Sequence, residues 1–439
     1  MKIGFVPIDN RPVCYTLPKI IAEIDENIEF FIPERTLLGD LKKYANIEKL
    51  FEWLKSLPKL DAIILSLDTL AYGGLISSRK CPETFDEIKS RIETLKNILL
   101  EKNCKIYAFS SIMRISNNNY NEEEKYYWKD YGEKIFEYSY SGMKNNDGIP
   151  PEILADYLRT RLRNYEINET YLGWQKEGVF DTLIFSKDDC APQGINVEEA
   201  KRLEAQGATT KTGADEIPLT LLARAIEKEI KVFVQYTEPE FKHSVSNYED
   251  VSIEQSVLGQ LELGGFTIVE DEAEADLVLV VNNFVEKQGE HVMGWETQPF
   301  NKTFTVPDKP YAVADVRYAN GADNDFVNVL LPQIDLKNFY GYSGWNTSAN
   351  TLGSLLAGVK VRWNAGQYNE DAFKRLQMIR FLDDWAYQAN VRVNGKTPDI
   401  ADLMRPYEEK LSKALGYELT SSITYSYPWK RSFEVEVSL

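Results

Sequence analysis

Short apolar segments bounded by turn residues recur along the whole chain, and amphipathic patterns fill the intervals between them. Five such segments precede residue 220, at residues 2–8, 28–32, 62–67, 105–110 and 182–186. Five more follow, at residues 231–236, 266–269, 277–281, 311–314 and 339–342. Most are apolar over their whole length, as strands are when helices cover both faces of a parallel sheet. The pattern therefore predicts ten strands in an α/β fold.

Apolar positions recur at helical spacing in several of the intervals. The clearest examples are residues 46–57, 85–100, 214–228, 254–263 and 371–389. Strands that alternate with helices in this way form right-handed βαβ units, which build parallel sheets.

Two architectures fit this order of elements. The favoured one has an N-terminal α/β lobe at residues 1–220, a second Rossmann-like lobe at 221–360, and a cleft between the two parallel sheets. Residues 361–439 then form a C-terminal appendage of helices with a terminal β element. The alternative is a single (β/α) barrel-like domain. The close spacing of the strands at 266–269 and 277–281 favours open sheets.

The net charge of the chain limits the kinds of molecule that it can bind. The 439 residues include 68 acidic and 50 basic ones, so the net charge is −18. Residues 361–439 hold equal numbers of both, and the excess lies upstream of them. Such a surface repels phosphate backbones, so we expect no nucleic-acid partner. The chain has no long apolar run, no signal-like start and no paired cysteine motif, which predicts a cytoplasmic protein without a membrane partner.

Histidine is scarce, and this limits the chemistry. Only His243 and His291 occur, so clustered-histidine zinc sites are excluded and carboxylates must carry most proton transfers. Aromatic residues make up 12% of the chain, which suits stacking on sugar rings.

Polar residues gather where the predicted strands end, which is where parallel sheets bind ligands. The candidate catalytic residues are Asp188, Asp189, Asp215, Glu216 and Asp315. The candidate substrate-binding residues are Asp9, Arg11, Asp68, Tyr72, Arg79, Arg114, Gln193, Asn320, Trp345, Asn346 and Asn350.

Each of the acidic candidates also has an ordinary structural interpretation. Asp188 and Asp189 either form a turn or act as a carboxyl pair in which one pKa is raised. Asp215 with Glu216 either caps a helix or takes part in catalysis. Asp9 either forms a buried salt bridge with Arg11 or holds substrate hydroxyl groups.

The remaining candidates leave similar alternatives. Arg79 and Arg114 either pair with acidic neighbours or bind an anion. The loop from Asp315 through Asn320 to Asp323 lacks the spacing of an EF-hand. The loop at residues 341–350 is neither a P-loop nor a dinucleotide fingerprint, and its Trp345 is either a packing anchor or a stacking platform.

Several of these segments occur together in a known order. They are Ile8-Asp9-Asn10-Arg11-Pro12, residues 70–76 (LAYGGLI), Asp188-Asp189, residues 213–216 (GADE) and residues 341–347 (GYSGWNT). Over roughly residues 1–360 the chain resembles the bacterial family catalogued as domain of unknown function 4127. The resemblance implies no activity, so the functional argument depends on the residues.

The residues favour a carbohydrate-processing enzyme of the glycoside hydrolase type, which needs only two carboxyl groups and no cofactor or metal. Its partner would be a small-molecule or oligosaccharide substrate. One alternative is a Mg²⁺- or Mn²⁺-dependent hydrolase or phosphatase that uses Asp9, Asp188, Asp189 and Asp315 as ligands. Another is a binding protein without catalysis.

Overall fold

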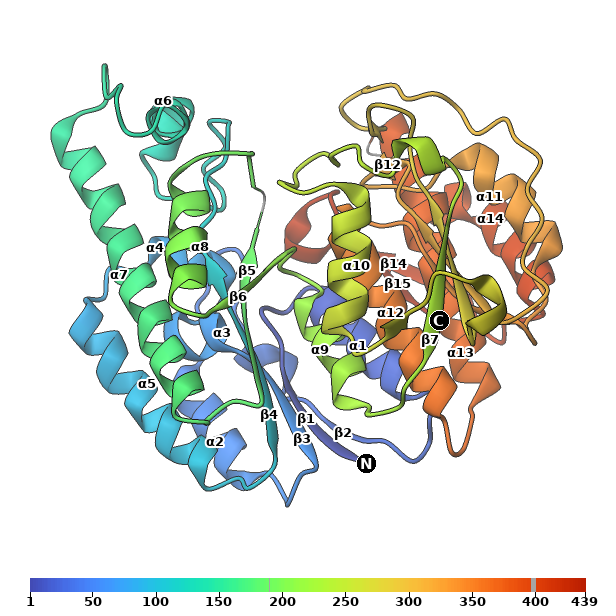
Figure 1. Ribbon diagram of the computed structural model, residues 1–439, viewed down its shortest axis with the longest axis horizontal. Coiled ribbons are helices and arrows are strands. Elements are labelled where there is room, and N and C mark those ends of the chain that lie inside the picture. Colours follow the sequence, from blue (N-terminus) through green and yellow to red (C-terminus); the bar gives the residue numbers. More distant parts are fainter. Residues whose placement is uncertain (189, 396–399) are drawn as a thin grey trace. The chain divides into compact units, whose positions relative to one another are not determined.

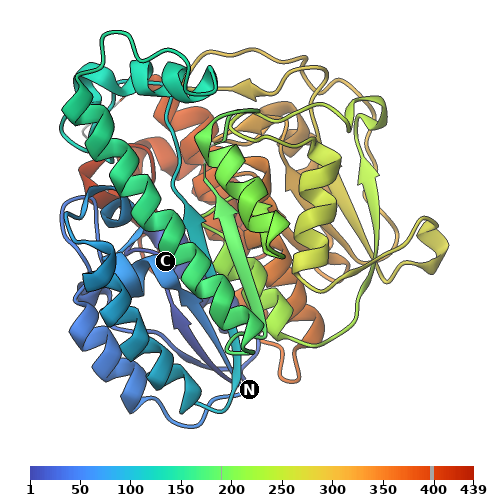
Figure 2. The same cartoon turned by 60° about the vertical axis from the view of Figure 1, so that its left-hand side comes forward.

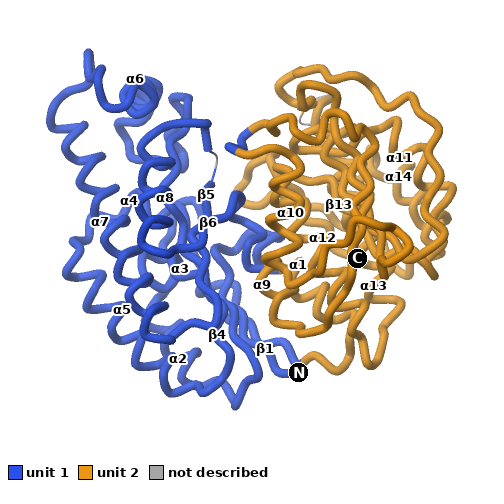
Figure 3. The backbone as a smooth tube through the Cα atoms, viewed as in Figure 1, with its two compact units in different colours: residues 1–15, 29–218, 248–250 blue, residues 16–28, 219–247, 251–439 orange. Residues whose placement is uncertain are grey.

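The chain folds into two compact units, shown in different colours in Figure 3. The computed structural model describes residues 1–188, 190–395 and 400–439. Unit 1 comprises residues 1–15, 29–218 and 248–250, and unit 2 comprises residues 16–28, 219–247 and 251–439. Residues 361–439 thus belong to the same unit as the second group of predicted strands.

Unit 1 is built on a six-stranded parallel sheet in the order β2-β1-β3-β4-β5-β6. Its strands are β1 (Lys2–Val6), β2 (Glu29–Phe31), β3 (Ala62–Ser66), β4 (Lys105–Ile112), β5 (Thr182–Lys187) and β6 (Thr209–Thr212). Apart from the edge strands, their residues are almost all buried. This burial explains why the strands read as continuous apolar runs.

Helices α2 (Ile47–Ser56), α5 (Phe85–Leu100) and α7 (Pro151–Lys176) lie on one face of this sheet (Figures 1 and 2). Their apolar side chains form one core with the strand residues beneath them, for example Leu54, Ile88 and Ile167 with Leu65. The other helices of this part of the chain are α3 (Leu67–Tyr72), α4 (Leu75–Lys80), α6 (Trp128–Tyr140) and α8 (Ile195–Ala205). Helices α1 (Pro12–Ala22) and α9 (Ile217–Ala225) contain residues of both units.

Unit 2 is built on a five-stranded parallel sheet in the order β13-β11-β9-β7-β8. Its strands are β7 (Lys231–Tyr236), β8 (Thr267–Ile268), β9 (Leu277–Asn282), β11 (Tyr311–Asp315) and β13 (Phe339–Ser343). Helices α10 (Ile253–Leu263) and α12 (Ser348–Asn364) contribute apolar side chains to one core with these strands.

The rest of unit 2 is helical apart from two small β pairs. It contains α11 (Asn324–Leu330), α13 (Glu370–Arg380), a π-helical segment (Phe381–Val391) and α14 (Ile400–Leu415). Strands β10 (Gly289–Glu290) and β12 (Tyr318–Ala319) pair in parallel, and β14 (Thr424–Ser426) pairs antiparallel with β15 (Glu436–Ser438).

The predicted α/β class is confirmed, and each of the ten predicted strands is present in one of the two sheets. The alternative of a single barrel is wrong, because the strands form two open sheets with separate edges. Strand β6 escapes prediction because it is a short polar edge strand of sequence TTKT. In the described ranges, no helix combines the length and apolar character needed to cross a membrane.

Candidate functional site

The structure divides the predicted site residues into two groups, one in each unit. Unit 1 holds Asp9, Arg11, Asp68, Tyr72, Arg79, Arg114, Asp188, Gln193, Asp215 and Glu216. Unit 2 holds Asp315, Asn320, Trp345, Asn346 and Asn350. Asp189 lies outside the described residues. Each group lies at or after the carboxyl ends of the parallel strands of its own sheet, for example Asp315 as the last residue of β11 and Asp68 in the first turn of α3.

Arg11 links two carboxylates in the loop after β1. Its Nε donates to Asp9 Oδ2 at 2.8 Å, and its backbone N–H donates to Asp9 Oδ1 at 2.9 Å. Its Nη1 donates to Asp215 Oδ2 at 3.0 Å, and Nη2 makes a second, shorter contact with Asp215 Oδ1. All three side chains are buried, so the salt-bridge interpretation of Asp9 and Arg11 describes this loop, and Asp215 extends it.

The pairing of Arg11 with Asp215 brings distant parts of unit 1 together. Asp215 follows β6, which forms the opposite edge of the sheet from β2 and is four strands away from β1. Residues 213–216 must therefore carry the chain back across the carboxyl ends of the strands. Gly213 begins this crossing with φ +98° and donates its N–H to the Lys187 carbonyl at 3.0 Å.

Asp68 is a buried carboxyl group at this edge of the sheet with a strongly raised pKa. It lies in the first turn of α3, which Ser66 caps, and Oδ2 accepts the Ser111 N–H at 2.8 Å. Burial raises its pKa to about 7, against the opposing effects of the Ser111 hydrogen bonds and the Arg79 charge. Asp68 therefore retains a proton near neutral pH, as a general acid must.

A partly buried ion cluster, which we call the Arg79 cluster, contains Arg79, Arg114, Glu123, Glu124 and Asp188. Arg79 Nη2 lies 2.7 Å from Asp188 Oδ2, and its Nη1 lies 3.3 Å from Glu124 Oε1. Arg114 lies 2.7 Å from Glu123 Oε2, 3.2 Å from Glu124 Oε1 and 3.7 Å from Asp188 Oδ2. Both arginines thus pair with acidic neighbours, and Asp188 sits between two guanidinium groups.

The two carboxyl groups Asp68 and Asp188 share Arg79 as a neighbour. One is fully buried and protonated near neutral pH, whereas the other is ion-paired and 16% exposed at its side chain. Two carboxyl groups in contrasting environments, one buried and one ion-paired, are typical of acid–base sites.

The other predicted residues of unit 1 have less defined surroundings. Tyr72 is buried one helical turn after Asp68, and its hydroxyl group has no hydrogen-bond partner within the described part of the chain. Glu216 is also buried, whereas Gln193 is exposed. Their roles in binding or catalysis stay predictions.

In unit 2, Asp315 belongs to a buried network at the ends of β9, β11 and β13. Its carboxylate accepts hydrogen bonds from Asn282 Nδ2 at 2.8 Å, from the Asp323 N–H at 2.8 Å and from the Tyr342 hydroxyl at 3.0 Å. Asp323 in turn lies 3.1 Å from Arg317 Nε. Burial, and next the charge of Asp323, raise the pKa of Asp315 to about 7. The donors around Asp315 describe a saturated internal network rather than an open cation site.

The loops next to this network bring two predicted asparagines together. Asn320 and Asn346 both have positive φ, +55° and +65°, and the Asn320 N–H donates to the Asn346 carbonyl at 3.0 Å. Asparagine tolerates this left-handed conformation better than most residues do. Trp345 is only 2% exposed and lies near Phe433, as a packing anchor does, and Asn350 is buried in α12.

Sequence reasoning missed several residues of these networks. Asp384 lies in the π-helical segment, accepts the Gly344 N–H at 2.7 Å, and has a pKa that burial raises to about 7. Glu124, Asn282 and Arg317 were also missed. Asn282 directly follows the predicted strand at 277–281 and could have been found by the same rule, but Asp384 lies in a helical pattern that gives no such signal.

Comparison of the sequence with known proteins assigns the chain to a protein family. No curated protein matches the chain. A family model with the description "Protein of unknown function (DUF4127)" matches residues 3–438, and the chain therefore belongs to this family.

Proposed function

We propose that the protein is a carbohydrate-processing hydrolase that acts on glycosidic bonds with the carboxyl groups of unit 1. The observation that carries this proposal is the contrast between Asp68, which is protonated near neutral pH, and Asp188, which two arginines hold. Glycoside hydrolysis uses one carboxyl group that donates a proton and a second one that is ionised.

In this mechanism Asp68 donates a proton to the departing sugar oxygen. Asp188, which forms ion pairs with Arg79 and Arg114, acts as base or nucleophile. The Arg11 guanidinium, held by Asp9 and Asp215, orders the crossing segment at residues 213–216 above the strand ends. The proposal includes a cytoplasmic location and an oligosaccharide or small glycoside as substrate.

The test compares purified wild type with Asp188→Asn and Asp68→Asn on a panel of nitrophenyl glycosides and oligosaccharides. We expect each substitution to lower kcat/KM by about 100-fold or more, since each removes an acid–base group. Asp61→Asn is the matched control, because Asp61 accepts a backbone hydrogen bond at the opposite, amino-terminal edge of the same sheet. Absence of turnover on every glycoside, or full activity in both test variants, would refute the proposal.

The pH profile gives a second readout for Asp68. Because the proton donor must be protonated, wild-type activity should fall as the pH rises above about 7. Asp68→Asn should lose this descending limb together with most of the activity. A profile that keeps the same alkaline limb in Asp68→Asn would show that another group supplies the proton.

A metal-dependent hydrolase is the second candidate, and one observation favours it. Asp9, Cys14 and Asp215 each offer a ligand atom within 4.8 Å of the others, and all three residues are buried. A thiolate with two carboxylates suits zinc better than Mg²⁺ or Mn²⁺. It ranks second because Arg11 already donates to both carboxylates. Bound metal in the purified protein, with activity lost to EDTA and in Cys14→Ala, would place it first.

A further inference from the structure

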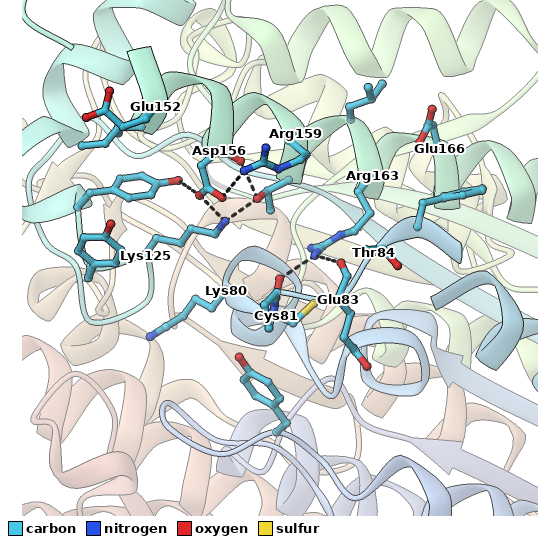
Figure 4. A pocket seen from close by; sticks show the side chains of 18 residues that line it. Lys80, Cys81, Glu83, Thr84, Lys125, Glu152, Asp156, Arg159, Arg163 and Glu166 are labelled. Atoms are coloured by element: carbon cyan, nitrogen blue, oxygen red, sulfur yellow. Dashed lines mark hydrogen bonds and ion pairs between the residues drawn. The ribbon is translucent and has the colours of Figure 1, made fainter. Parts of the chain in front are cut away.

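Unit 1 contains a pocket of about 800 Å³ that none of the residues discussed above lines. Its walls come from the junction of α4 and α5 at residues 80–85, from residues 125–127 and from the first half of α7 (Figure 4). This volume is within the range of roughly 300–1,000 Å³ that is typical of small-molecule sites. We call it the α4–α7 pocket.

Four basic and four acidic side chains line this pocket. The basic ones are Lys80, Lys125, Arg159 and Arg163, and the acidic ones are Glu83, Glu152, Asp156 and Glu166. Lys80 and Lys125 directly follow Arg79 and Glu124, which pair with each other in the Arg79 cluster. Neighbouring residues of the same two segments thus serve the ion cluster and the pocket.

The acidic residues of the pocket equal the basic ones in number, but they do not all pair with them. Asp156 accepts hydrogen bonds from Lys125 Nζ at 2.6 Å, Arg159 Nη2 at 3.1 Å and the Tyr127 hydroxyl at 3.0 Å. Glu83 pairs with Arg91, which is not a lining residue. In Figure 4 the carboxylates of Glu152 and Glu166 point away from the hydrogen-bonded centre.

Arg163 is a buried cation whose hydrogen-bond partners are all neutral. It is 6% exposed, and its guanidinium donates to the backbone carbonyls of residues 78, 81 and 83 and to the Asn164 side chain. In the part of the chain that the structure describes, no carboxylate forms an ion pair with it. Lys80 is half-buried, and its Nζ donates to the Glu122 backbone carbonyl at 2.9 Å, with the charges of residues 122–124 nearby. Buried charges are normally paired, so the guanidinium of Arg163 favours an anion in the pocket.

Aromatic side chains supply the rest of the binding surface. The aromatic lining residues are Tyr44, Phe85, Tyr126 and Tyr127. Two of them are largely exposed, Tyr44 at 51% and Tyr126 at 81%. Exposed tyrosine rings offer a flat apolar face and a hydroxyl group, which is the combination that binds sugar rings.

We propose that the α4–α7 pocket binds an anionic monosaccharide, which is either a sugar phosphate or a sugar acid. Its acidic group contacts Lys80 and Lys125, and its ring packs against the tyrosines. Arg163 contributes a fixed positive charge, because its donors are already used by the surrounding carbonyls. This inference does not depend on the proposed hydrolase activity.

The experiment measures binding to the full chain by calorimetry and thermal shift. The probes are glucose phosphate, glucuronate, glucose and inorganic phosphate. We expect saturable binding of at least one of the two anionic sugars, and much weaker binding of glucose and of inorganic phosphate. Which anionic sugar binds distinguishes a phosphate from a carboxylate ligand.

Variants locate the binding site. Lys125→Met and Lys80→Met should each weaken binding about tenfold or more, because each removes a charged hydrogen bond to the anion. Arg159→Gln should also weaken it, and this side chain is 72% exposed, so the variant is expected to fold normally. Lys134→Met is the matched control, because Lys134 is a nearby surface lysine that does not line the pocket.

Three results would overturn the inference. They are the absence of saturable binding by both anionic sugars, equal binding of glucose, and unchanged affinity in all three pocket variants. Asp68→Asn should bind the anionic sugar as wild type does, even if it abolishes hydrolysis. The two proposals can therefore fail separately.

Discussion

At the scale of single residues, burial is the main influence on the candidate site. Asp68 and Asp188 are both carboxyl groups at strand ends, but Asp188 forms ion pairs with two arginines, whereas burial raises the pKa of Asp68 to about 7. Arg11 shows the complementary case, a buried cation whose charge two carboxylates balance. In both cases the neighbours decide the protonation state and the stability.

The first prediction concerns the pKa of Asp68 and the stability of the fold. Because the pKa of Asp68 is about 7 in the folded state and about 4 in the unfolded chain, wild-type stability falls as the pH rises between these two values and levels off above about 7. Asp68→Asn cannot ionise, so its free energy of unfolding should improve relative to wild type by about 2–4 kcal/mol between about pH 5 and about pH 8. Urea unfolding at both pH values measures this difference, and a constant difference would contradict the assignment.

The second prediction concerns Arg11. Arg11→Met leaves Asp9 and Asp215 buried without their shared cation, so we expect a loss of about 3–5 kcal/mol in the free energy of unfolding. Arg159→Met is the matched control, since its exposed pair with Asp156 should contribute less than about 1 kcal/mol. Urea unfolding measures both free energies of unfolding. Equal losses in the two variants would mean that the buried pairing stabilises the fold no more than the exposed pair does.

At the scale of elements, short helices place the site residues. Helix α3 has only six residues, and it presents Asp68 because Ser66 caps its start and Gly73 ends it in the left-handed conformation. The long helix α7 holds the neighbouring loops with buried polar side chains, such as Arg163 and Asn164. These buried polar residues interrupt its apolar stripe, which explains why the sequence pattern did not reveal this helix.

The third prediction tests the end of α3. Gly73 has φ +89°, and a Cβ added there would lie 2.9 Å from the Ala45 nitrogen and from Tyr44 Cβ. Gly178 has a similar φ of +80°, but a Cβ there would meet nothing within 4 Å in the described structure. Both alanine variants should suffer the left-handed strain of about 1–2 kcal/mol, and Gly73→Ala should lose at least about 1 kcal/mol more. Chemical denaturation of both variants checks the difference.

At the scale of the whole molecule, both units contain buried carboxyl groups that hold a proton. Asp68 in unit 1 and Asp315 and Asp384 in unit 2 all have pKa values raised to about 7. In the unfolded chain such groups ionise near pH 4. Between these values the folded chain binds more protons than the unfolded chain, so stability must decrease as the pH rises.

The fourth prediction follows from this linkage. The Tm of the wild type should be lower at about pH 8 than at about pH 5.5, by about 5 °C or more. Groups with lowered pKa values, such as Asp156 and Glu238, lose their contribution only at more acidic pH and do not reverse the trend. Differential scanning calorimetry at the two pH values tests it, and a higher Tm at pH 8 would contradict the three assignments together.

The hydrophobic pattern of the sequence was sufficient to predict the ten strands and the α/β class, because a strand buried on both faces must be apolar along its length. It was also sufficient to place Asp9, Asp188 and Asp315 at strand ends. It did not reveal that Arg11 pairs with Asp215, that Arg79 and Arg114 enclose Asp188, or that Asp384 lies beside Gly344. Those contacts join residues that are far apart in the chain, so only tertiary packing decides which charges are neutralised and which carboxyl groups keep a proton.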